Sequence, residues 1–373
     1  MKRCHPVLVL LATLIAGACG LRTSTPPGAL PTSSMPQPQA GTPAETPQAA
    51  LPTEQEEVPP IYFFYAIHTH ASGDYLPYTE PPMLTIDPQT AENMVLTISS
   101  MQEVLDRYQI KGTWEVVYGT AKGVCTYQGE NHIFRQLQGA GHEIAAHAHQ
   151  ADHIDDVVQN LRNHCGVIPV TNSGFLLEAE RAGPEGAQEA LSLAIQVSID
   201  NGLTVGTENL APSGGKNPFT EICQAQLGIG NDMWLQTGNL MFPWRPDYVN
   251  GNICAHNPEG EMVFIDHVSI EWTVLPGQGK ADVLGPAEFA NLRTMFDAAL
   301  AYMEQNRPQR LAVWGFVTHI TEYAPGSFGR NPPDLSALAA LDDFLAYVDS
   351  KRDQGRIIYA TASQIAHLAF RDQ

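Results

Sequence analysis

Histidines gather in two short segments of this 373-residue chain, at spacings that suit metal binding. The first segment contains His68 and His70, and the second contains His147, His149 and His153. Neutral imidazole is a frequent ligand of zinc, and also of nickel, iron and copper. The two segments therefore predict a site for a divalent metal ion, with zinc as the first candidate.

Backbone geometry decides which of these histidines share a face. The first pair follows an apolar run, residues 61–67, that is typical of a strand, and strand residues two apart point the same way. In the second segment, His147 and His149 share a face if the strand continues. His149 and His153 share a face if a helix has begun, because residues four apart are neighbours on a helix. Either geometry suits a divalent ion, and the sequence leaves both open.

Another histidine, His319, follows a third apolar run, residues 311–318. Single histidines elsewhere in a chain are more typical of ordinary hydrogen-bonded positions than of metal ligands. We expect that structural role for the remaining candidates considered: His132, His164, His256, His267 and His367.

The elements that must position these histidines are repeated β-α units. After Pro60, short apolar runs alternate with amphipathic segments, of which residues 94–108 and 289–303 carry apolar side chains at steps of three and four. Strands are expected at residues 61–67, 113–118, 142–147, 167–170, 203–206, 262–270, 311–318 and 357–360. This alternation predicts an α/β fold, a barrel of seven or eight strands. Active sites of such barrels lie at the carboxyl ends of the strands, where three of these strands carry histidine.

The amino-terminal residues have the features of a secretory signal peptide. Lys2 and Arg3 precede an apolar run, residues 7–15, which is shorter than the roughly 20 residues that span a bilayer. We expect residues 1–18 to be removed on export. The next residue, Cys19, resembles the lipidated cysteine of a bacterial lipobox, which predicts an anchored lipoprotein; cleavage to give a free secreted protein is the alternative.

Composition separates the rest of the chain into a linker and a domain. Residues 19–60 contain ten prolines and few apolar side chains, so they are expected to be a disordered linker to a single domain at 61–373. The chain has 20 lysines and arginines against 40 aspartates and glutamates, a formal charge of −20. This excess of negative charge disfavours nucleic acid as a partner, and we expect membrane contact only through a lipid on Cys19.

The cysteines of the domain are expected to form disulfides after export. Four cysteines allow three pairings, and their spacing does not choose among them. They contain no C-x-x-C spacing, so a structural zinc site is not expected. The four residues are Cys125, Cys165, Cys223 and Cys254.

Several motifs resemble those of the polysaccharide deacetylases, the chitooligosaccharide deacetylase-like carbohydrate esterases. Residues 141–147, Gly-His-Glu-Ile-Ala-Ala-His, are similar to the family's G-H-E-I-x-x-H run. Further landmarks follow in the family's order at residues 111–119, 244–248, 317–319 and 357–365. The resemblance covers about residues 61–368 and implies a deacetylase-type barrel.

The first strand departs from the family pattern. In the family it ends in Asp-Asp-Gly, where one aspartate acts as base and the next binds metal, whereas this chain has His68-Thr69-His70. The resemblance implies that His70 replaces the metal ligand. The base would be His68, Glu115 or Asp74, and the residues leave that choice open.

The family's metal-binding H-x-x-x-H motif is also displaced. It would begin at His147, but its partner position holds Ala151, so the spacing survives only from His149 to His153. The resemblance therefore implies that the second and third ligands come from the segment between residues 147 and 153.

Two further roles are implied by the resemblance. His319 matches the family's late L-x-H motif, which supplies a general acid. Arg245 lies in a segment similar to the R-x-P motif, which would orient the base, although Asp247 is inserted there.

The function that the resemblance implies is metal-dependent removal of acetyl groups from an extracytoplasmic glycan. A hydrolase of another amide or ester would keep the barrel and the metal. An anchored glycan- or metal-binding protein on a catalytically degenerate barrel is the third hypothesis, because both first-strand aspartates are missing.

Overall fold

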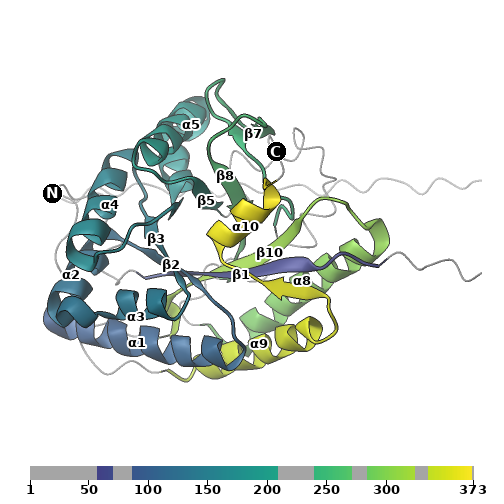
Figure 1. Ribbon diagram of the computed structural model, residues 1–373, viewed down its shortest axis with the longest axis horizontal. Coiled ribbons are helices and arrows are strands. Elements are labelled where there is room, and N and C mark those ends of the chain that lie inside the picture. The colour runs from purple at the N-terminus through teal and green to yellow at the C-terminus, as the bar shows by residue number, and fades with distance from the viewer. Residues whose placement is uncertain (1–56, 70–85, 209–238, 271–283, 324–334, 372–373) are drawn as a thin grey trace, which may run out of the picture. The chain divides into compact units, whose positions relative to one another are not determined.

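The structure is a computed structural model that describes residues 57–69, 86–208, 239–270, 284–323 and 335–371 (Figure 1). These residues belong to one compact unit, Glu56–Gln373. The predicted signal peptide, most of the predicted linker, and the candidate site residues His70 and Asp74 lie outside the described residues.

Strands and helices alternate along the described chain, as expected for β-α units. The strands are β1 (Ile61–His68), β2 (Thr113–Val116), β3 (Glu143–His147), β4 (Thr171–Ser173), β5 (Val205–Glu208), β6 (Pro246–Asp247), β7 (Asn252–His256), β8 (Val263–Asp266), β9 (Val268–Ser269), β10 (Ala312–His319) and β11 (Ile357–Tyr359). The α-helices are α1 (Pro88–Arg107), α2 (Tyr118–Gln128), α3 (Ile133–Gly139), α4 (Ala151–Cys165), α5 (Phe175–Asp200), α8 (Pro286–Asn306), α9 (Leu338–Arg352) and α10 (Ala362–Ala369), with 3-10 turns η1 (Gly129–Asn131) and η3 (Ile320–Tyr323). None of the helices in the described ranges is long and apolar enough to cross a membrane.

The main sheet is parallel and almost closes on itself. Its order is β8-β5-β4-β3-β2-β1-β10-β9, and β11 adds to β1. The ends approach because β8 pairs with β5, while β9, just beyond β8, pairs with β10. The Asn239 Nδ2 atom bridges the remaining gap by donating to the carbonyls of Asp266 and Val313. The predicted α/β barrel is therefore confirmed.

Alternation along β1 separates the barrel interior from the outer core. Phe63 and Tyr65 point outward into the large apolar core shared with the helices, whereas Phe64 and Ala66 belong to a second cluster inside the barrel. Gly315 of β10 makes room for that interior packing, because a Cβ atom there would lie 2.1 Å from the Phe64 ring. Apolar side chains thus fill the barrel below its carboxyl end.

Helix α10 lies against the amino ends of the strands (Figure 1). The backbone N–H of Ala362 donates to Thr113 Oγ1 at 3.1 Å, and that of Ser363 donates to Glu143 Oε2 at 3.0 Å. A carboxylate at a helix N-terminus is favourable because the first N–H groups of a helix lack partners within it. Glu143 therefore has a structural role at the end of the barrel opposite the histidines.

The fourth strand was predicted in the wrong place. Residues 167–170 are apolar and suggested a buried strand, but Ile168 and Val170 are exposed at 72% and 39%. The strand is instead β4, whose residues are all polar. Polar residues are accommodated there because Thr171 hydrogen-bonds to the half-buried carboxylate of Glu143 and Ser173 to the buried carboxylate of Glu115.

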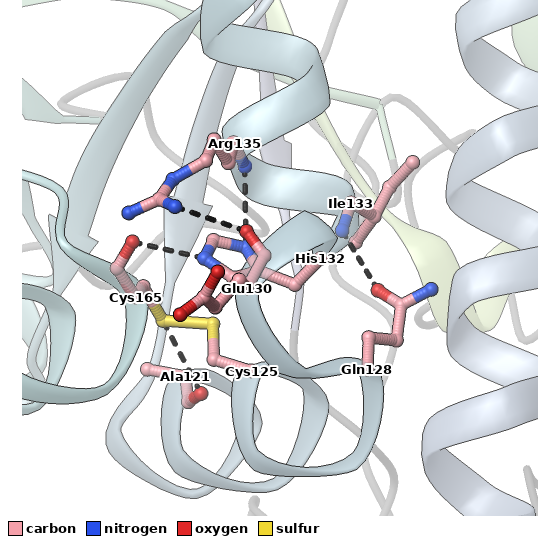
Figure 2. Close-up of a disulfide and its surroundings, with 8 residues drawn as sticks. All are labelled: Ala121, Cys125, Gln128, Glu130, His132, Ile133, Arg135 and Cys165. Atoms are coloured by element: carbon pink, nitrogen blue, oxygen red, sulfur yellow. Dashed lines mark hydrogen bonds between the residues drawn. A yellow bond between two sulfur atoms is a disulfide. The ribbon is translucent and has the colours of Figure 1, made fainter.

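A disulfide joins the helices that follow β2 and β3. Figure 2 shows Cys125 of α2 bonded to Cys165 of α4, one of the three pairings that the sequence allowed. His132 lies beside it, with Nδ1 accepting from the Arg135 backbone N–H and Nε2 donating to the Cys165 carbonyl. Burial lowers the pKa of His132, consistent with this neutral, structural imidazole. Cys254 is also in a disulfide, with a partner outside the described residues.

Candidate active site

Six polar side chains meet inside the barrel near the carboxyl ends of its strands. They come from six strands that are spread along the sequence, and five of the six are fully buried. We call them the polar layer: His68, Glu115, His147, Ser173, Thr207 and His319. The position agrees with the expectation that chemistry lies at the carboxyl ends of barrel strands.

Glu115 of β2 is the centre of the polar layer. Its Oε2 atom accepts a hydrogen bond from Ser173 Oγ at 2.6 Å, and its Oε1 atom accepts one from Thr207 Oγ1 at 2.5 Å. His68 Nε2 lies 2.7 Å from Oε2. Burial raises the pKa of Glu115, and its hydrogen bonds together with the neighbouring imidazoles of His267 and His319 oppose that rise.

The orientation of His147 follows from a count of protons. Its Nδ1 atom lies 2.6 Å from Ser173 Oγ, whose single hydrogen is already donated to Glu115. His147 must therefore carry its proton on Nδ1 and donate it to the serine. The lone pair of His147 Nε2 then points at His149 Nε2, 2.7 Å away.

Two imidazole nitrogens at this distance need a proton or a cation between them, because two lone pairs repel. His149 is only half-buried and lies where β3 leaves the barrel, so the contact lies at the rim. The bond from His147 Nδ1 to Ser173 is the usual way in which a protein fixes the tautomer of a metal-binding histidine. The donor set of the two Nε2 atoms fits a divalent ion.

His319 joins the polar layer to a second buried carboxylate. Its backbone N–H donates to Glu322 Oε2 at 2.7 Å, and its ring Nδ1 lies 3.0 Å from Glu322 Oε1. Its Nε2 atom lies 3.0 Å from Nδ1 of His68, which is paired with it in the register of β1 and β10. Contacts of 2.7 to 3.0 Å thus connect Glu322, His319, His68 and Glu115 in one chain.

His267, in the bend between β8 and β9, is buried in the barrel, with its ring packed edge-on against Phe64. Neither ring nitrogen has a hydrogen-bond partner among the described residues. Burial lowers its pKa to about 4, so the ring is neutral near pH 7, and the carboxylate of Glu115 opposes this lowering. The expectation that His267 is a satisfied polar residue is wrong. The sequence feature that pointed to its burial is its place inside the predicted strand at residues 262–270.

The structure decides between the two geometries considered for the second histidine segment. The ladder continues past β3, because the Ala148 backbone N–H donates to the Ser173 carbonyl, and His147 and His149 come together as strand alternation predicts. Helix α4 begins only at Ala151, after the extended residue Gln150. The helical pairing of His149 with His153 is therefore wrong. His153 is half-buried in the first turn of α4.

Arg245 does not orient a base among the histidines. Trp244 bridges antiparallel to Phe264 of β8, so the next residue lies toward the amino end of that strand. There the Arg245 guanidinium donates to the Pro258 carbonyl and stacks over the Phe370 ring, 4.4 Å from its centroid. The role implied for Arg245 by the resemblance is corrected, because it lies at the opposite end of β8 from the polar layer.

Among the described residues, two other groups of side chains have the composition of a metal site. The ligand atoms of His68, Glu115 and His147 lie within 4.8 Å of one another, but Ser173 Oγ already bonds both Glu115 and His147 Nδ1. Cys125, His132 and Cys165 form the second group. There the two sulfur atoms are bonded to each other and both His132 nitrogens are hydrogen-bonded. The rim pair His147 and His149 is the better candidate.

Comparison with known proteins identifies the fold. No family model and no curated protein matches the chain. Among solved structures, a probable polysaccharide deacetylase from Pseudomonas aeruginosa PAO1 aligns over 84% of this chain and 92% of its own, with 13% identity and a TM-score of 0.50. The chain has the polysaccharide deacetylase fold. The Puue allantoinase gives the same four values, and a glycoside hydrolase/deacetylase from Parabacteroides distasonis aligns over 85% of this chain and 74% of its own, with 11% identity and a TM-score of 0.50.

The end of the first strand lacks the family's aspartates, but the adjacent strand β2 places the carboxylate of Glu115 beside it. His68 ends β1, where the family resemblance expects an aspartate, and it is in register with Glu115 on the adjacent β2. The 2.7 Å contact between them brings a buried carboxylate to the carboxyl end of β1 from the neighbouring strand. From the sequence, Glu115 is one of three alternatives for the base, beside His68 and Asp74.

Proposed function

We propose that the chain is a metal-dependent hydrolase that removes acetyl groups from a glycan outside the cytoplasm. The observation that carries the proposal is the meeting of His147 Nε2 and His149 Nε2 at 2.7 Å, beside the polar layer of a deacetylase-type barrel. The predicted signal peptide and the predicted lipid anchor on Cys19 support an extracytoplasmic location.

In this proposal, His147 and His149 hold a divalent ion, zinc as first candidate, and His70 is the predicted third ligand. Such an ion polarises an acyl carbonyl and lowers the pKa of bound water. Ser173 keeps His147 in the tautomer that presents Nε2. Because Ser173 also bonds Glu115, the ligand pair and the buried carboxylate are fixed relative to each other.

His68 and His319 supply the proton transfers. His68 is proposed as the base, and Glu115 at 2.7 Å stabilises the positive charge that His68 gains when it accepts a proton from the attacking water. His319 donates a proton to the leaving amine or alcohol. In this proposal His68 Nδ1 and His319 Nε2, 3.0 Å apart, share one proton, while His319 Nδ1 keeps its own toward Glu322. The shared proton is the one that passes to the leaving group, and the proton taken from the attacking water replaces it, so the pair returns to its starting state.

The test is acetate release from a panel of acetylated glycans by the purified protein, before and after chelation and zinc reconstitution, with elemental analysis of the same samples. We expect one metal ion per chain, acetate release that chelation abolishes, and loss of both metal and activity in His147→Ala. His164→Ala, at an exposed position on α4, is the matched control and should change neither.

Each contrary outcome has a distinct meaning. Bound metal without acetate release, but with turnover of another acylated substrate, would replace the deacetylase by a hydrolase of a different amide or ester. Glycan or metal binding without any turnover would favour a binding protein. Absence of stoichiometric metal from the reconstituted protein would contradict the proposal as a whole.

A further inference from the structure

Glu322 has a place in the site that no sequence motif indicated. It lies in η3, three residues after His319, and both side chains are buried, at 3% and 5% exposure. We propose that Glu322 is a positioning residue that fixes the tautomer and the orientation of His319. The kinetic part of this inference rests on the proposed hydrolase function, whereas the tautomer itself does not.

Both oxygens of the Glu322 carboxylate face His319. The backbone N–H of His319 can only donate, and it occupies Glu322 Oε2 at 2.7 Å. The other oxygen, Oε1, lies 3.0 Å from His319 Nδ1. An ionised carboxylate only accepts, so His319 must carry a proton on Nδ1. The Nε2 atom is then the one that faces the polar layer.

The turn that carries Glu322 is itself held in place. The Tyr65 hydroxyl, on β1, lies 2.6 Å from Thr318 Oγ1 and 2.9 Å from the Tyr323 hydroxyl. The backbone carbonyl of Glu322 accepts from the N–H of Leu284 at 3.3 Å. Because bonds on both sides of Glu322 tie the turn to the barrel, the carboxylate is presented to His319 in one position.

A purely structural role would need only half of this arrangement. A carboxylate whose role was only to accept a hydrogen bond from the backbone at the end of β10 would bond the His319 N–H and leave the imidazole ring to other partners. Here the same carboxylate also bonds the ring, and the opposite ring nitrogen lies 3.0 Å from His68, the proposed base. A carboxylate that orients an acid-base histidine in this way acts through the histidine, without touching substrate.

The decisive variant is Glu322→Gln. A carboxamide has one oxygen, which must accept from the His319 backbone N–H, so its amide group faces Nδ1 as a donor. His319 must then accept at Nδ1 and carry its proton on Nε2. The control is Glu103→Gln, an exposed position on α1.

The measurement is the 15N NMR spectrum of the zinc-reconstituted full-length protein with labelled histidine, the His319 signals being identified by their absence in His319→Gln. We expect protonated Nδ1 in the wild type and unprotonated Nδ1 in Glu322→Gln. In the same samples, kcat for acetate release should fall by about 10³- to 10⁴-fold with little change in KM. Glu322→Asp, which keeps the charge, should restore Nδ1 protonation and part of kcat.

Two results would overturn the inference: wild-type His319 with no proton on Nδ1, or Glu322→Gln that keeps the wild-type tautomer and kcat. The first is read on the wild-type protein, so it stands even if the variants do not fold. Absence of acetate release from the wild type would count against the proposed function alone, because the NMR comparison would still decide the role of Glu322.

Discussion

At the scale of single residues, the site depends on how each hydrogen-bonding atom is used. Ser173 has one hydrogen, and giving it to Glu115 leaves its oxygen as the acceptor for His147 Nδ1. Glu322 has two oxygens, and giving one to a backbone N–H leaves the other for His319 Nδ1. In both cases a residue outside the reacting atoms selects which imidazole nitrogen faces the site: His147 Nε2 faces His149, and His319 Nε2 faces His68.

The variant Ser173→Ala is expected to weaken zinc binding. Without the serine oxygen, His147 Nδ1 loses the acceptor that fixes its tautomer, so zinc should bind about 10- to 100-fold more weakly. Competition with a chromophoric chelator measures this affinity. Ser350→Ala, at an exposed serine on α9, should leave zinc affinity unchanged. Equal zinc affinity in Ser173→Ala and the wild type would count against His147 as a ligand through Nε2.

At the scale of elements, the strands that carry the site are stabilised through the helices that follow them. Helix α2 follows Glu115 on β2, and α4 follows His147 on β3. The disulfide between Cys125 and Cys165 joins these two helices (Figure 2). A covalent link across two consecutive β-α units therefore lies behind two strands of the polar layer.

Removal of that disulfide is the element-scale prediction. It closes a sequence separation of 40 residues, for which loss of loop-closure entropy gives about 4 kcal/mol of stabilisation. The double variant Cys125→Ala/Cys165→Ala should lower the free energy of unfolding by roughly that amount, measured by urea denaturation. A stability equal to that of the wild type would show that the helices hold their places by packing alone.

At the scale of the whole molecule, the barrel separates two polar regions by a layer of apolar side chains. The polar layer occupies the carboxyl end, Phe64 and its neighbours fill the space below, and Glu143 with α10 occupies the amino end. His142 also serves that amino end, where its Nδ1 atom accepts from the Gly112 backbone N–H and from Trp114 Nε1. These bonds require a neutral ring.

The pH dependence of stability is the prediction at this scale. Burial lowers the pKa of His142 from 6.5 to about 4. Between these values the unfolded chain binds a proton that the folded chain excludes, so stability should fall as the pH drops from about 6.5 to 4, by roughly 2–3 kcal/mol for this group. Urea denaturation across that range, compared between the wild type and His142→Asn, isolates the contribution. A wild-type slope that the variant retains in full would assign the effect to other groups.

The sequence alone was sufficient for the fold class and for the strands that end in histidine. Periodicity located α1 and α8, and seven of the eight expected strands overlap observed ones, because alternating apolar runs reflect burial that each segment requires by itself. Strand alternation also predicted that His147 and His149 share a face. Periodicity and shared faces depend on residues close together in the chain, so the sequence spacing predicts them directly.

Only the tertiary structure decided which distant residues share the barrel interior. β4 was misplaced because its residues are polar, and their partners Glu115 and Glu143 lie on other strands. The sequence does not indicate the parts of Glu322 and His267 in the barrel interior, and it suggests a role for Arg245 that the structure does not support. The reason is that hydrogen-bond partners, and distance from the polar layer, depend on how separate elements close into a barrel. Sequence spacing predicts which side chains of one segment share a face. The tautomer of a buried histidine is instead set by a hydrogen-bond acceptor that the fold brings from another element.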